Sequence, residues 1–180
     1  PISSVRSSLP LHINGCFDIT SDRRGVFDGE WNRSLFKYGC SKVAALLLVR
    51  IAKDVDVGPG NLFQYWPSVP GKEQAIGQAL PRHVFEQLCE YECMPCGNDE
   101  RLAAPGEVLS LPTKWNKVRE AFLADDDDDL LLANPVPPKH VIDGFKAIKT
   151  PLPVLTPERV RDKLRIEIDP ACPVSAAPRE

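Results

Sequence analysis

The stretch that decides the fold is WNRSLFKYGCSKVAALLLVRIAKD, which runs from Trp31 to Asp54. Apolar residues recur along it at the spacings of a helix that packs against a core. They are Leu35, Phe36, Cys40, Val43, Leu47 and Ile51, with further apolar sides from Ala44, Ala45, Leu46 and Leu48. The pattern predicts a long and largely buried helix. Asp28 or Gly29 precedes this helix, and Glu30 lies near its N-terminal end, where a negative charge is favourable.

The residues before this helix predict a strand and then a turn. Pro10 to Thr20 contains alternating apolar residues, and Asn14-Gly15 can supply a bulge or a turn within it. The polar segment from Ser21 to Gly25 is typical of a tight turn, in which the Asp22 carboxylate bonds backbone amides.

Further helices are expected after the long one. Gly58-Pro59-Gly60 ends its neighbourhood, and Asn61 can cap a short helix that Pro67 stops. A second long helix is predicted from Lys72 to Tyr91, with Pro81 kinking or restarting it. Its inward residues are Ile76, Leu80, Val84, Phe85 and Leu88.

The rest of the chain is broken into short elements. They are a small hairpin or loop pair within Cys93–Leu111, a strand at Glu107–Leu111, a helix over Lys114–Ala124 capped by Thr113, a strand at Leu130–Ala133, a helix over Pro138–Ile148, and a helix that starts at Thr156-Pro157-Glu158.

These elements predict an α+β fold: an N-terminal strand or hairpin, a mainly helical body and a small hairpin or α/β unit. The predicted regions are a strand and turn segment over residues 1–30, a helical region over 31–92, a small α/β region over 93–168 and a disordered tail over 169–180.

Composition excludes several classes of function. The net charge is −3, so no strongly basic field exists to hold nucleic acid. The longest apolar run, Val43 to Val49, is far below the roughly 20 residues of a membrane-spanning helix. Six cysteines in 180 residues are too few for a disulfide scaffold and indicate reduced thiols in the cytoplasm or nucleus. Because the chain starts at Pro1 and its only methionine is Met94, we expect an excised piece or a processed product.

The order of four motifs resembles the sacsin repeat. They are LPLHINGCFDITSDRRGVF from Leu9 to Phe27, Trp31-Asn32, Phe63-Gln64-Tyr65-Trp66-Pro67, and the segment from Val154 to Arg165. The first motif is the most specific, and together the motifs cover roughly residues 9 to 166.

The resemblance implies a chaperone-associated function. Sacsin repeats begin with an ATPase domain similar to those of gyrases, heat-shock chaperones and histidine kinases, and the family is associated with co-chaperone work and protein quality control. This chain would follow such a domain, and its first 30 residues would extend that domain's sheet. The implied partners are the upstream ATPase domain, which binds any ATP, and client or chaperone proteins.

The chain by itself is expected to be no enzyme and to need no cofactor. The nucleotide motifs, Asp-x-Gly-x-Gly and a glycine-rich lid, are expected before this segment and not within it, and Gly58-Pro59-Gly60 is interpreted as lacking the partners of a phosphate loop. The resemblance therefore implies a non-catalytic part that couples the ATPase to client or partner binding. Two alternatives stay open: a plain protein-interaction scaffold, and a metal-stabilised module.

Arg23 and Arg24 are the candidate site residues. In related chaperones the region after the ATPase domain supplies a cation to the terminal phosphate of the nucleotide. Arginine suits this role because its planar guanidinium is always charged. The alternative is a turn that Asp22 holds, with both arginines solvated.

A cysteine cluster is the candidate metal site. Cys89, Cys93 and Cys96 have the spacing of a radical S-adenosylmethionine motif, and with His83 they could hold zinc. The chain is too short for the radical-enzyme barrel, and Pro95 stands where that motif usually has an aromatic residue. The competing interpretation places Cys89 at a helix end and the other two in a loop, with no metal.

Other polar and aromatic residues indicate no separate site. The run Asp125–Asp129 is more typical of a solvated linker, or of contact with a basic partner, than of a cation site. The histidines His12, His83 and His140 are scattered. The tryptophans, predicted to pack in the core or between elements, are Trp31, Trp66 and Trp115.

Overall fold

The structure is a computed structural model that describes residues 8–54, 56–72, 76–97, 101–111, 115 and 131–161. The predicted helix over Lys114–Ala124, apart from Trp115, lies outside the described residues, as do Asp125–Asp129 and the tail over 169–180. The domain boundaries stay predictions.

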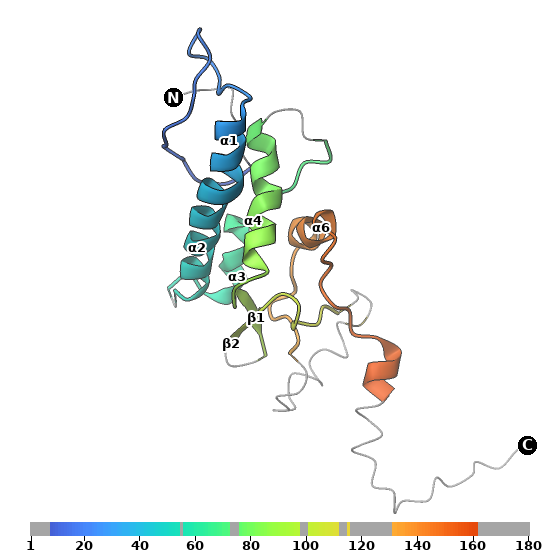
Figure 1. Cartoon of the computed structure of the whole chain (residues 1–180). Helices are drawn as coiled ribbons and strands as arrows, with labels where there is room; N and C mark the ends of the chain where they lie inside the picture. The colour runs from blue at the N-terminus through green and yellow to red at the C-terminus, as the bar shows by residue number, and fades with distance from the viewer. Residues whose placement is uncertain are drawn as a thin grey trace, which may run out of the picture.

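The predicted long helix is present and is the longest helical segment among the described residues (Figure 1). It begins after Gly29 as α1 (Glu30–Ser34), passes through a π-helical turn, η1 (Leu35–Cys40), and continues as α2 (Ser41–Ala52). All the junction residues have helical dihedral angles, so the three pieces make one continuous rod.

The π-helical turn keeps one face of this rod buried. Along the whole rod, one line of buried side chains recurs every four residues, at Asn32, Phe36, Cys40, Ala44 and Leu48. In a regular α-helix, four residues rotate about 40° more than a full turn. Over the four steps from Asn32 to Leu48 this excess rotation would reach about 160°, and the two side chains would point in nearly opposite directions. The π-helical turn is wider, because the Ser41 N–H donates to the Phe36 carbonyl five residues back. It therefore takes up about one additional residue and offsets much of this excess rotation.

A second helix packs along the buried face. It begins with a 3₁₀ turn, η3 (Ile76–Ala79), and continues as α4 (Leu80–Leu88) with Pro81 in its first turn. Proline is tolerated there because a first-turn amide has no helical partner. The predicted restart at Pro81 is confirmed. The predicted inward residues Leu80, Val84, Phe85 and Leu88 are fully buried.

Four aromatic rings join α4 to the rest of the core. Helix α6 (Lys139–Ala147), close to its predicted bounds, brings Phe145 to 5.0 Å from Phe85, centroid to centroid. Trp66 lies 5.8 Å from Phe85 and 5.9 Å from Phe145, and Phe63 lies 5.6 Å from Trp66. The core is thus closed by edge and tilted ring contacts between segments far apart in sequence.

The short helix that carries Phe63 starts earlier than predicted. It consists of α3 (Pro59–Leu62) and the 3₁₀ turn η2 (Phe63–Tyr65). The residue before it is Gly58, with a φ of +66°, and not Asn61. Glycine adopts this left-handed conformation without a steric cost, and Pro59 suits the first helical position. The Asn61 side chain instead donates to the Val57 carbonyl.

The β structure is small. Strands β1 (Met94–Cys96) and β2 (Arg101–Ala103) form the predicted antiparallel hairpin. The predicted strand at Glu107–Leu111, and the described part of the one at Leu130–Ala133, are reduced to isolated bridges. These bridges join Cys96 to Ala133, Leu109 to Leu132 and Ser110 to Val154. The helix-rich body with one small sheet confirms the α+β class.

The predicted strand at Pro10–Thr20 was wrong. Among the described residues only Ile19 forms a bridge, to Val26, because no strand runs beside the rest of the segment. The segment is instead attached to the long helix by side chains, as described below. The predicted helix start at Thr156 is confirmed: residues 157–161 are helical, and the Arg159 N–H donates to the Thr156 hydroxyl.

The long helix is less buried than predicted. Val43 is 67% exposed, Leu46 45% and Leu47 42%, because α4 covers only the opposite face. No helix within the described parts of the chain is long and apolar enough to cross a membrane.

Of the described glycines, Gly144 on α6 leaves the least room for a side chain. A Cβ added there would lie 2.1 Å from the Phe85 ring, and that ring is fully buried. We therefore expect Gly144→Ala to lower the free energy of unfolding by about 1–3 kcal/mol, measured by urea denaturation. The control is Gly60→Ala, where no atom lies within 4 Å of the added Cβ. Equal stability of the two variants would contradict the packing described here.

Candidate functional site

Residues 18–27 form a short hairpin that presents the two candidate arginines, and we call it the arginine hairpin. The Phe27 N–H donates to the Asp18 carbonyl (2.8 Å), and the Thr20 N–H donates to the Gly25 carbonyl (3.0 Å). Between these bonds Ile19 and Val26 form their antiparallel bridge. The two sides of the hairpin are therefore paired up to a tip over residues 21–24.

Side chains hold the tip in one shape. The Thr20 hydroxyl donates to the Asp22 carboxylate (2.5 Å) and accepts from the Gly25 N–H (3.0 Å). The Asp22 carboxylate also accepts from the Arg24 N–H (3.1 Å), which confirms the predicted role of Asp22. These bonds, the Thr20 hydroxyl first, lower the pKa of Asp22, so this carboxylate is ionised at neutral pH.

The structure places Arg23 and Arg24 together at this tip, and both are exposed. Arg23 adopts a left-handed backbone conformation with a φ of +57°, which is uncommon for a residue other than glycine. Because such a conformation persists only where its surroundings enforce it, the bonds of Thr20 and Asp22 fix the direction of the tip.

Asn32 attaches the arginine hairpin to the long helix. Its side-chain amide donates to the Asp18 and Phe27 carbonyls, each at 2.7 Å, and its side-chain oxygen accepts from the Asp18 N–H at 3.0 Å. Asn32 is fully buried, so these bonds replace the water its amide would otherwise need. In the sequence, Asn32 stands out only as part of the Trp31-Asn32 motif. Its position in line with the buried apolar residues of the helix could have indicated a buried amide with backbone partners.

Trp31 supports the same segment from outside. Its indole N–H donates to the Cys16 carbonyl (2.8 Å), while its ring is 55% exposed. Of the predicted positions, in the core or between elements, the core is wrong for Trp31, which instead bonds the neighbouring segment through Cys16. The prediction is confirmed for Trp66, which is 3% exposed. Trp115 packs, partly buried, on a small cluster of Leu109, Leu132 and Leu155.

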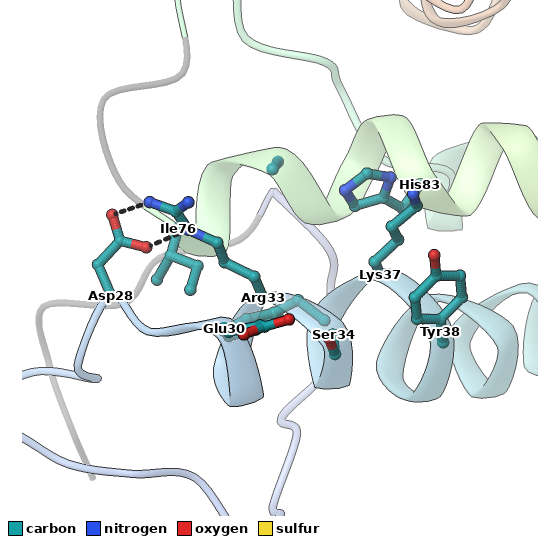
Figure 2. A pocket seen from close by; sticks show the side chains of 10 residues that line it. Asp28, Glu30, Arg33, Ser34, Lys37, Tyr38, Ile76 and His83 are labelled. Atoms are coloured by element: carbon teal, nitrogen blue, oxygen red, sulfur yellow. Dashed lines mark hydrogen bonds and ion pairs between the residues drawn. The ribbon is translucent and has the colours of Figure 1, made fainter.

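A polar cleft of about 560 Å³ lies beside the hairpin, between the N-terminal half of the long helix and the start of α4 (Figure 2). At one end Arg33 and Asp28 form a two-bond ion pair, with nitrogen–oxygen distances of 2.7 and 3.1 Å. The hydrogen bond from Arg33 lowers the pKa of Asp28. At the other end lie Lys37 and Tyr38, with the Lys37 ammonium 5.0 Å from the Tyr38 ring centroid.

The cleft contains one of the predicted site residues, His83. Its Nδ1 lies 2.9 Å from the Glu86 carboxylate, one turn further along α4. Acidic and basic side chains both line the cleft, so it offers partners to cations as well as to anions. The cleft was not predictable from the sequence, because the residues that line it come from two segments about 40 residues apart.

The cysteine cluster has the chemistry of buried thiols. Cys93 and Cys96 are fully buried at β1, and their thiols donate to the Leu88 and Arg101 carbonyls. Burial raises the pKa of Cys93 to about 12. The competing interpretation is correct in placing Cys89 directly after α4, but it is wrong for Cys96, which lies in strand β1 and not in a loop. Within the described residues, no group of three or more His, Cys, Asp or Glu side chains could hold a metal ion.

One sequence feature was misjudged. Asp56-Val57-Gly58-Pro59-Gly60 has the spacing Asp-x-Gly-x-Gly of a nucleotide motif, although the segment was interpreted as lacking the partners of a phosphate loop. The structure gives it a local role between α2 and α3, where Gly58 supplies the left-handed residue before the four-residue helix α3. A helix this short has too weak a dipole to bind phosphate by itself.

Comparisons with known proteins agree with the resemblance in the sequence. The chain is similar to human sacsin. The two are 26% identical over 133 aligned residues, which cover 68% of this chain and 3% of sacsin. No protein-family profile matches the chain, and no solved structure matches it at a significant level. The finding supports a sacsin-related region, and the activity and partners of the far longer sacsin are not carried over by it.

Removal of the Asn32 amide should release the arginine hairpin. We expect Asn32→Ala to lower the free energy of unfolding by about 2–4 kcal/mol, since three part-buried hydrogen bonds between the Asn32 amide and the backbone of Asp18 and Phe27 are lost. Trypsin should also cut faster after Arg23 and Arg24. The matched control is Asn61→Ala, which removes one exposed hydrogen bond and should cost less than about 1 kcal/mol. An unchanged trypsin rate in Asn32→Ala would contradict the anchoring role.

Thiol labelling tests the burial of the cysteines. With a pKa of about 12, only about one Cys93 thiol in ten thousand is ionised at pH 8, so native Cys93 should resist iodoacetamide. Exposed Cys16 should be alkylated first, as followed by peptide mass spectrometry. Both should react at similar rates in denaturant. Native labelling of Cys93 as fast as that of Cys16 would contradict the structure.

Proposed function

We propose that this chain is a non-catalytic part of a sacsin-like chaperone-associated protein, in which it couples an upstream ATPase domain to client or partner binding. The similarity to sacsin supports the chaperone context. The observation that carries the coupling role is the arginine hairpin, whose tip holds two exposed arginines and whose base is bonded to the buried Asn32 of the long helix.

The coupling requires a cation at the nucleotide. Arg23 or Arg24 would approach the terminal phosphate, where a planar guanidinium stabilises the charge that spreads during phosphoryl transfer. The Thr20 and Asp22 bonds hold the tip ready for this contact and lower its entropy cost.

The long helix would carry the signal onward. A displacement of the arginine hairpin is transmitted through Asn32 into the rod that α4 packs against, and Trp66 and Phe145 extend this contact through Phe85. Coupling of this kind requires a contiguous packed network with two arrangements. The contacts supply the network, and the ATPase domain would supply the force.

A plain interaction scaffold is the second candidate function. The exposed apolar residues of α2 favour it, because a partner surface on this helix needs no nucleotide. The two candidates differ in whether Arg23 and Arg24 affect turnover.

ATP hydrolysis by the parent repeat, including its upstream domain, separates them. Arg23→Ala or Arg24→Ala should lower kcat at least about tenfold with little change in ATP affinity, as for arginines that contact a transferring phosphate. The matched control is Arg159→Ala, an exposed arginine on the distant C-terminal helical turn. Unchanged turnover in both hairpin variants would leave the scaffold function and refute the coupling mechanism.

A further inference from the structure

The outer face of the long helix is apolar, exposed and uncovered by the elements that contact α2. Val43, Leu46 and Leu47 lie on it at i, i+3 and i+4. We call these three residues the outer face. The described elements that pack most on α2 are η1, α3 and α4, and in Figure 1 α2 forms the margin of the molecule opposite α4. Adjacent exposed aliphatic side chains of this kind mark interaction sites more often than isolated ones.

The charge around the outer face has a single sign. From Trp31 to Lys53 the sequence holds five lysines and arginines and no acidic residue, although the whole chain has a net charge of −3. Lys42 lies one turn before Leu46, and Arg50 lies one turn after it. Both are exposed, and no carboxylate of the described residues forms an ion pair with either.

We propose that the outer face binds an acidic amphipathic helix of a partner protein. Its apolar side would cover Val43, Leu46 and Leu47, and its carboxylates would meet Lys42 and Arg50. Both observations are needed: the aliphatic side chains supply the apolar contact, and the cations flanking them select an acidic partner. The proposal names the surface and the partner chemistry for the partner-binding half of the proposed function, and it rests on that half.

The charge distribution disfavours a second copy of this chain as the occupant. A two-fold dimer places the same surface on both subunits, so Lys42 and Arg50 would face cations on a helical stretch, Trp31 to Lys53, that holds no acidic residue. Like charges brought together in this way oppose association.

An anionic membrane matches the charge of the outer face but not its shape. An interfacial helix buries a broad apolar side with large aromatic and aliphatic residues. Here the inner side of the helix, including Phe36 and Leu48, is already packed against the core, and only a narrow strip remains outside. A partner helix fits such a strip better than a lipid surface does.

The test uses a fluorescent peptide of about 18 residues, with leucines at helical spacing and glutamates elsewhere. Anisotropy should show binding to the intact chain that weakens with added salt. Leu47→Ser should lower the affinity about tenfold or more, through loss of apolar contact. The double variant Lys42→Glu and Arg50→Glu should lower it similarly and remove most of the salt dependence.

Matched controls lie elsewhere on the surface. Val154→Ser alters another half-exposed aliphatic residue, and the pair Lys139→Glu and Lys146→Glu makes the same charge change on α6. These controls should bind the peptide as the unmodified chain does. All variants change exposed residues, and circular dichroism with urea denaturation verifies that each is folded.

Three outcomes would overturn the proposal. One is peptide binding that is absent, or equal in the outer-face variants and the controls. Another is binding to vesicles of phosphatidylcholine and phosphatidylserine that the outer-face variants lose while peptide binding is unchanged. The third is a concentration-dependent dimer that only these variants abolish. No nucleotide is present, so failure here is distinguishable from failure of the arginine hypothesis, which the turnover assay tests.

Discussion

The side chain of Asn32 is the interaction on which the N-terminal part of this structure depends. One amide satisfies three backbone groups on two sides of a hairpin, and it does so from a fully buried position on a helix. Burial of a side-chain amide without hydrogen-bond partners costs free energy. When the partners are present, the amide favours one arrangement of the backbone, because its donors and acceptor fit that arrangement alone. A segment with a single bridge and no strand ladder thereby has a defined place.

The geometry of the long helix makes this attachment compatible with the core. Asn32 and the apolar residues that pack on α4 lie on one line because the π-helical turn offsets the drift of four-residue spacing. The same arrangement leaves Val43, Leu46 and Leu47 on the opposite side. One helix therefore anchors the hairpin and packs in the core through one face, and it leaves the opposite face exposed.

The candidate groups lie in three different environments. Arg23 and Arg24 lie at the exposed tip of a braced hairpin, Cys93 and Cys96 are buried, and the polar cleft combines opposite charges. The similarity to sacsin, which extends over 68% of this chain, provides the chaperone context in which the chain would act. The arginine hairpin is bonded to Asn32 near the start of the long helix, and the outer face lies on the α2 part of that helix, so one helix links the proposed nucleotide contact and the proposed partner site.

The sequence by itself determined the elements whose signals are local. The period of Trp31–Asp54, the proline at position 81, the Thr156-Pro157-Glu158 start and the Ser21–Gly25 turn each depend on neighbouring residues, and all are found. Tertiary structure decided the rest, because exposure and pairing depend on which segments meet. Whether Val43 is buried depends on where α4 packs, and whether residues 10–18 form a strand depends on a partner that periodicity does not supply. The arginine turn was predictable from its residues, whereas Asn32 as its anchor and the cleft beside it arise only from the folded chain.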